Sequence, residues 1–150
     1  MNKKLISLLG GTGDLGTGLA NRLLKAGYKV IIGSRTLEKA QHAERSLGKN
    51  TKGLLNKDAA LQGEIIILTV PFAHQRGIVE ECKTELKGKL FIDTTVPLMP
   101  PKVATVQLPS EGSAAEIAQN ILGDDVREYQ LFRIFQQSYY KVIKKLTVMF

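Results

Sequence analysis

A glycine-rich stretch near the start of the chain, LLGGTGDLGTGLA at residues 8–20, limits the possible folds more than any other feature. It separates an apolar, strand-like run at 4–9 from a helical pattern at 15–26. Gly11, Gly13 and Gly16 have the spacing G-x-G-x-x-G, which in this strand–turn–helix context predicts a site for the pyrophosphate of a dinucleotide. The first glycine permits a tight turn, the second lets the phosphates approach the backbone, and the third lets helix and strand pack closely. The alternative interpretation is an ordinary glycine-rich turn.

Helical and strand-like patterns alternate along the chain after this stretch. The first helix is expected to present Leu15, Leu19, Leu23 and Leu24 on one face and to stop before Gly27. Further strands are predicted at 29–33, 52–55, 64–70 and 90–93, and further helices at 36–47, 73–86 and 113–122, with a helical turn opening at Asp58. Four of the five prolines fall within 97–110, which predicts an irregular loop. The alternation predicts an α/β fold with a Rossmann-type, doubly wound parallel sheet, as a single domain over residues 1–125.

The end of the second predicted strand indicates which dinucleotide the chain would bind. Proteins that bind NAD usually carry Asp or Glu there, where the carboxylate bonds the ribose 2′-hydroxyl. This chain instead reads Gly33-Ser34-Arg35, with no acid at that point. Arg35 can pair with a 2′-phosphate, Ser34 can donate a hydrogen bond to it, and Lys39, one helical turn further, adds a second cation. The pattern therefore favours NADP over NAD, the alternative being a solvated arginine and a surface lysine.

Composition restricts the remaining function classes. The chain has 150 residues and one cysteine, Cys82, so it has no internal disulfide and fits a reducing compartment. No run approaches the roughly 18 apolar residues of a membrane span, and we expect a cytoplasmic protein without a membrane partner. Residues 1–125 carry 16 basic and 13 acidic side chains and residues 126–150 carry 5 and 1, so the net charge of +7 is concentrated in the tail. A general nucleic-acid surface is not indicated, and metal-ligand spacing is absent.

The motifs together resemble the NADPH-dependent coenzyme F420 reductases, also called F420:NADP oxidoreductases. The stretches that carry the resemblance are LLGGTGDLGTGLA, VIIGSRTLEKA, LTVPFAH, FIDTTVPL and EGSAAEIAQNIL, which cover about residues 4–125 in the order of the family. The resemblance implies that NADP(H) is the cofactor and that a hydride passes directly between its nicotinamide and a deazaflavin, coenzyme F420, which is a small-molecule substrate. STEAP-type ferric reductases have a similar domain, so the resemblance identifies the cofactor better than the acceptor.

The resemblance also implies which residues bind the cofactor. It assigns the 2′-phosphate to Thr12, Ser34, Arg35 and Lys39, and the pyrophosphate to the backbone of residues 10–15. It assigns the walls of the nicotinamide pocket to Val70, Pro71 and Phe72, with His74 close by. The predicted cofactor-binding residues are therefore Gly10, Gly11, Thr12, Gly13, Asp14, Leu15, Gly16, Ser34, Arg35, Lys39, Val70, Pro71, Phe72 and His74.

His74 and Asp93 have two interpretations each. His74 either orients a ring or a carboxamide, or is a solvated or capping residue in the first turn of a helix. Asp93 and Thr94 end a strand at the edge where open α/β sheets bind ligands, but Asp93 can equally cap the following loop. Cys82 lies between Glu81 and Lys83 without an activating partner, which predicts a structural role. No catalytic acid–base pair is identified, and direct hydride transfer does not need one.

Residues 126–150 depart from the family's pattern. The family continues with another strand and a helical C-terminal domain that contributes to a homodimer and covers the acceptor, whereas this chain reads REYQLFRIFQQSYYKVIKKLTVMF from residue 127. Six of the nine aromatic residues fall in this tail. It is interpreted either as a truncated or frame-shifted end, or as an amphipathic helix with Leu131, Phe135, Tyr139, Val142 and Leu146 near one face.

Two functions from different classes follow from these features. The first is an NADP-dependent oxidoreductase that transfers a hydride between NADP(H) and F420 or a similar acceptor. The second is an NADP-binding module without turnover, because the domain that covers the acceptor is missing from the pattern. A related reductase acting on an imine or a ferric chelate is a third, weaker hypothesis.

Overall fold

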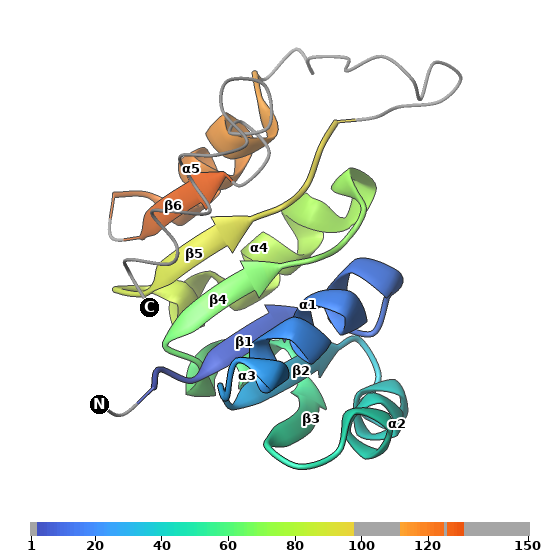
Figure 1. Cartoon of the computed structure of the whole chain (residues 1–150). Helices are drawn as coiled ribbons and strands as arrows, with labels where there is room; N and C mark the ends of the chain where they lie inside the picture. The colour runs from blue at the N-terminus through green and yellow to red at the C-terminus, as the bar shows by residue number, and fades with distance from the viewer. Residues whose placement is uncertain (1–2, 98–111, 125, 131–150) are drawn as a thin grey trace, which may run out of the picture.

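The computed structural model of the chain describes residues 3–97, 112–124 and 126–130. Its strands form one parallel sheet in the order β3-β2-β1-β4-β5-β6 (Figure 1). The strands are β1 (Ile6–Leu9), β2 (Val30–Ser34), β3 (Thr51–Leu55), β4 (Ile65–Leu68), β5 (Leu90–Asp93) and β6 (Arg127–Gln130). The helices are α1 (Asp14–Lys25), α2 (Leu37–Leu47), α3 (Asn56–Gln62), α4 (Phe72–Leu86) and α5 (Ala114–Leu122). The predicted Rossmann-type, doubly wound sheet is confirmed.

The strand order reverses between β1 and β4, and this reversal locates the ligand crevice. The chain moves outward from β1 through β2 to β3, returns to β4 and then moves outward through β5 to β6. The connections after β1 and β4 therefore leave in opposite directions and open a gap above the carboxyl ends of these strands. In the register, Leu9 pairs with Leu68, which pairs with Asp93 on its other side, so these strand ends lie level.

Each face of the sheet has its own core because successive side chains of a strand point to opposite faces. Val30 and Ile32 pack in a cluster with Ala20 of α1 and Ala43 of α2. Ile31 belongs to the other cluster, formed largely by β1, β4 and β5 with helices α3, α4 and α5. Strands buried on both faces are apolar almost throughout, as the sequence pattern predicted.

Ser7 is the exception in β1, and the structure explains why a polar residue is tolerated there. It is fully buried, and its hydroxyl donates to the backbone oxygen of Ala59 in α3 at 2.7 Å. Gly63 leaves the space for this hydroxyl, since a Cβ at Gly63 would overlap it. The bond satisfies a polar group that would otherwise be buried without a partner.

The structure differs from the sequence prediction at three places. Leu15 was expected on the apolar face of the first helix, but it lies in the first turn of α1 with 46% of its surface exposed. The third helix begins at Asn56 rather than Asp58. The sheet extends past residue 125 through β6, so residues 127–130 of the predicted tail form a strand paired with β5. The loop predicted at 97–110 lies almost entirely, and the helix predicted from Leu131 entirely, outside the described residues.

Helix α2 lies unusually close to β3, and one glycine makes this possible. A Cβ on Gly53 of β3 would overlap the backbone oxygen of Ala40 in α2. Lys39 directly precedes Ala40, so it belongs to the part of α2 that makes this contact.

We expect Gly53→Ala to lower the free energy of unfolding by roughly 1–3 kcal/mol, because the helix backbone must move to admit the methyl group. The control is Gly77→Ala in α4, where no atom lies within 4 Å of an added Cβ. That change should stabilise the chain by about 0.5–1 kcal/mol, since alanine favours the helix. Urea unfolding of both variants tests the contact. Equal stability of the two variants would contradict it.

Candidate functional site

The glycine loop between β1 and α1 is shaped by contacts that exclude side chains. Gly10 has φ +66°, a conformation that favours glycine, and a Cβ there would overlap Val70. The Gly11 N–H donates to the backbone oxygen of Gly33 at the end of β2, at 3.0 Å. A Cβ on Gly16 would lie 2.5 Å from the Gly11 Cα, so α1 packs directly on the turn. These contacts are the ones that the G-x-G-x-x-G spacing predicts for its first and third glycines.

The second glycine of the motif faces open space. Gly13 caps the N-terminus of α1 with φ −83°, and no atom lies within 4 Å of a Cβ built on it. The Thr17 N–H bonds the Gly13 oxygen at 2.9 Å, which leaves the N–H groups of Asp14, Leu15 and Gly16 without helical partners. Open space in front of unpaired N–H groups at a helix N-terminus fits a pyrophosphate.

A cleft of about 490 Å³ lies above the carboxyl ends of β1, β2 and β4, at the reversal of strand order. The predicted site residues that line it are Gly10, Thr12, Gly13, Ser34, Arg35, Lys39, Val70, Pro71 and His74. The predicted residues that do not line it are Gly11, Asp14, Leu15, Gly16 and Phe72. Sequence reasoning missed four further lining residues, Thr36, Asn56, Thr69 and Ile78. Of these, Thr36 and Thr69 lie within two residues of a predicted site residue, while Asn56 had no signal beyond its place after a predicted strand.

One end of the cleft is cationic. Ser34 is buried and its Oγ accepts the N–H of Thr36 at 3.4 Å, which holds the turn after β2. Arg35 and Lys39 are exposed, and neither pairs with a carboxylate in the part of the chain that the structure describes. Two unpaired cations beside a hydroxyl can hold a phosphate dianion.

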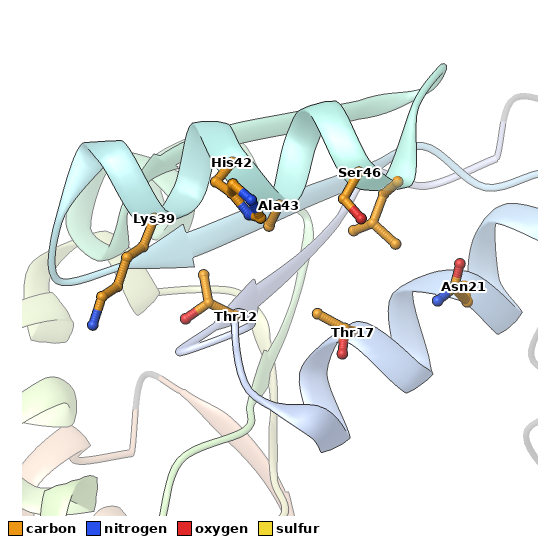
Figure 2. A pocket seen from close by; sticks show the side chains of 8 residues that line it. Thr12, Thr17, Asn21, Lys39, His42, Ala43 and Ser46 are labelled. Carbon is orange, nitrogen blue, oxygen red and sulfur yellow. The ribbon is translucent and has the colours of Figure 1, made fainter.

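A groove of about 570 Å³ between α1 and α2 adjoins this cationic end. Figure 2 shows Lys39 and His42 on successive turns of α2, on the side that faces the glycine loop and Thr12. Thr12 and Lys39 line both the groove and the cleft. An anion placed at their shared boundary would therefore be reached from the loop and from α2.

The other end of the cleft is formed where β4 passes into α4. Val70 and Pro71 line it, and the His74 N–H donates to the Pro71 oxygen at 2.9 Å in the first turn of α4. The exposed His74 side chain also lines the cleft, whereas Phe72 does not. This end is less polar than the cationic end, because Val70 and Pro71 contribute apolar side chains to it.

Asp93 does not line the cleft, and its bonds match the capping interpretation. It is fully buried at the end of β5 and accepts the Thr95 N–H at 2.8 Å and the Thr95 hydroxyl at 3.1 Å. Gln75 of α4 donates from Nε2 to Asp93 at 2.5 Å and to the Ala114 oxygen at 2.8 Å. Burial raises the pKa of Asp93, while the hydrogen bonds from Thr95 and Gln75 oppose the rise. Asp93 is thus joined to α4 through Gln75, which also bonds the start of α5.

Cys82 has a structural role, as predicted. It is fully buried, and burial together with Glu81 and Glu85 raises the pKa of its thiol to about 12. A thiol held neutral in this way is unreactive. Within the described ranges, no three His, Cys, Asp or Glu side chains are grouped closely enough to hold a metal ion, and no helix has the length and apolarity to cross a bilayer.

Comparison with known proteins identifies the family. The family model described as "NADP oxidoreductase coenzyme F420-dependent" matches residues 5–97, more than half of the chain. The chain belongs to this F420-dependent NADP oxidoreductase family. The match covers the glycine loop, both ends of the cleft and Asp93.

Relatives of this family member share a substantial part of its sequence. The F420-dependent NADP reductase of Methanocaldococcus jannaschii is 39% identical over 153 residues, which cover 94% of this chain and 66% of the relative. That of Methanothermobacter marburgensis is 44% identical over 130 residues, covering 79% of this chain and 58% of the relative. The chain therefore spans about three fifths of the length of these relatives.

Solved structures resemble this family member in fold. A candidate F420-dependent NADP reductase from Arthrobacter sp. FB24 superposes with a TM-score of 0.72 at 19% identity, covering 86% of this chain and 62% of the other. A pyrroline-5-carboxylate reductase from Coxiella burnetii gives 0.64 at 22% identity, covering 86% and 43%. At these identities the likeness concerns the fold alone.

We expect Asp93→Asn to lower the free energy of unfolding by roughly 1–3 kcal/mol, because an amide N–H replaces an acceptor facing Gln75 and Thr95. The loss depends on pH in a defined direction. Because the folded pKa of Asp93 is raised, its contribution to stability is complete below the unfolded value of about 3.9 and declines as pH rises through the folded value.

Urea unfolding of the wild type and Asp93→Asn at several pH values from 4 to 8 measures this difference. The advantage of the wild type should shrink as pH rises. The control Asp124→Asn changes an exposed carboxylate and should leave the difference near zero. An advantage that grows with pH would contradict the assignment.

Proposed function

We propose that the chain binds NADP(H) in the cleft and transfers a hydride between it and coenzyme F420. The observation that carries the proposal is the cationic end of the cleft, where Ser34, Arg35 and Lys39 stand without an acid at the end of β2. The relatives named F420-dependent NADP reductase, at 39–44% identity, support the same assignment.

In this proposal each end of the cleft has a separate task. Thr12, Ser34, Arg35 and Lys39 hold the 2′-phosphate through hydroxyls and cations. The unpaired N–H groups of Asp14, Leu15 and Gly16, beside the open space at Gly13, hold the pyrophosphate. Bound NADPH supplies a hydride from its nicotinamide ring.

The less polar end would position that ring and exclude water from it. Val70 and Pro71 would form the wall behind the ring, and His74, which also lines the cleft, would orient its carboxamide. The missing acid–base pair is consistent with this reaction, because alignment of the two rings supplies most of what direct transfer needs.

The acceptor, the homodimer and the cytoplasmic location remain predictions. The chain spans about three fifths of the length of the relatives it matches, so the role of F420 needs a direct test on this chain. In that test NADPH and F420 are mixed with the purified chain, and the absorbance of NADPH and of F420 is followed. Turnover supports the oxidoreductase. Tight NADP⁺ binding with no turnover would leave the chain as an NADP-binding module.

We expect Arg35→Ala to weaken NADP⁺ binding about 10- to 100-fold and to leave NAD⁺ binding within about twofold, because only NADP⁺ offers a phosphate to the guanidinium. Calorimetric titration of both nucleotides measures the preference. The matched control is Arg45→Ala, an exposed arginine in the last turn of α2 that does not line the cleft. Equal loss for both nucleotides would contradict the 2′-phosphate assignment.

We expect Gly13→Ala to weaken NADP⁺ and NAD⁺ alike by at least about tenfold, because a methyl group enters the space proposed for the pyrophosphate. Stability should fall by less than about 1 kcal/mol, since alanine is only a poorer N-cap residue. The control Gly18→Ala lies in the same helix with nothing within 4 Å of its Cβ, and it should leave binding unchanged. Unchanged binding by Gly13→Ala would place the pyrophosphate elsewhere.

A further inference from the structure

Asn56 is a buried polar residue at the floor of the cleft. It is the first residue of α3, directly after β3, and 1% of its surface is exposed. It lines the cleft together with Gly10, Ser34 and Thr69. A buried carboxamide needs partners for both its oxygen and its nitrogen.

The oxygen of this carboxamide has its partner. The Gly10 N–H donates to Asn56 Oδ1 at 3.1 Å. Because a backbone N–H can only donate, the atom that faces it is the oxygen, and this fixes the orientation of the amide. Gly33 makes room for the bond, since a Cβ there would lie 2.9 Å from Oδ1. Asn56 therefore ties the end of β3 to the turn that follows β1.

The nitrogen of the carboxamide has no partner. Nδ2 is buried and makes no hydrogen bond to any residue that the structure describes. A purely structural role for Asn56 accounts for Oδ1 but leaves two N–H groups buried and unpaired, which destabilises a protein. A donor that the protein leaves unpaired beside a ligand cleft points to an acceptor on the ligand.

We propose that Asn56 binds the adenosine ribose of NADP(H), with Nδ2 donating to a ribose oxygen directly or through one water while Oδ1 holds Gly10. The inference rests on the proposed function. Leu55, the residue before Asn56, pairs with Ser34, so Asn56 lies beside the strand end where the 2′-phosphate of that ribose is proposed to bind. Val70 and Pro71, proposed for the nicotinamide, follow β4 instead. Asn56 is thus placed for the adenosine half.

Two variants separate the roles of the amide. Asn56→Leu removes the donor without adding charge, and Asn56→Asp keeps an acceptor for the Gly10 N–H while removing the donor. Calorimetry with NADP⁺, NAD⁺ and 2′,5′-ADP should show about tenfold weaker binding of all three by both variants. The control is Asn50→Asp, the same change at an exposed asparagine. Asn50 precedes β3 whereas Asn56 follows it, and this variant should bind as the wild type does.

A measurement on the wild type covers the case in which a variant does not fold. In ¹⁵N-labelled protein, the side-chain amide signals of Asn56 should change position and exchange more slowly with water when 2′,5′-ADP is added, and those of Asn50 should not. Unchanged Asn56 signals at saturating 2′,5′-ADP overturn the proposal. Wild-type affinity of Asn56→Leu for these nucleotides also overturns it. A loss of affinity confined to Asn56→Asp overturns it too, because that loss would report charge repulsion alone.

The result also separates this inference from the proposed function. If the wild type binds NADP⁺ with the Arg35 dependence expected above and the Asn56 tests fail, only the role of Asn56 is wrong. If the wild type binds neither NADP⁺ nor 2′,5′-ADP, both proposals are overturned.

Discussion

The close contact between α1 and the turn after β1 is the constraint on which the rest of the site depends. Gly16 approaches the Gly11 backbone so closely that a Cβ at Gly16 would lie 2.5 Å from the Gly11 Cα. This contact directs the N-terminus of α1 across the end of β1, and Gly13 then faces open space. The unpaired N–H groups of the first helical turn point to the reversal of strand order as a consequence. A larger residue at Gly11 or Gly16 would displace the helix and remove this arrangement.

Buried polar groups join the strands to the helices and loops that pack against them. Ser7 joins β1 to α3, Asn56 joins the end of β3 to Gly10, and Asp93 joins β5 to Gln75 of α4. Ser7 and Asp93 lie within parallel strands, and Asn56 directly follows one. Such groups destabilise the fold when they lack partners, so their bonds specify how the loops are arranged. Asn56 Nδ2 is buried without a partner among the described residues, and Asn56 lines the cleft.

The two ends of the cleft differ in their chemistry because they belong to different halves of the sheet. The cationic end follows β2 and the start of α2, and the less polar end follows β4 and the start of α4. The doubly wound topology brings both to one edge, although the two segments are more than 30 residues apart in the chain. A ligand with a phosphorylated ribose at one end and a planar ring at the other matches this division.

The sequence alone determined the fold class, the glycine loop and the cationic strand end, because each depends on local patterns: apolar runs, G-x-G-x-x-G and Gly33-Ser34-Arg35. The family resemblance named Val70, Pro71 and His74, which the structure places in the cleft. A helical period does not report which turns of a helix are covered, so Leu15 was expected on the apolar face of the first helix and is exposed. The strand at 127–130 was likewise assigned to the tail, since its pairing with β5 is not visible in its own composition.

Only the tertiary structure decided the roles of Asp93 and Asn56. Asp93 ends a strand at the ligand-binding edge, but it is buried, bonds Thr95 and Gln75, and does not line the cleft. In the sequence, nothing distinguishes Asn56 from other polar residues that follow a strand. The structure shows that the N–H of Gly10, 46 positions earlier, donates to its side chain. The physical reason is the same in both cases. The partner of a buried polar group is set by packing between segments that are distant in the chain, and a local sequence pattern does not show which segments pack together.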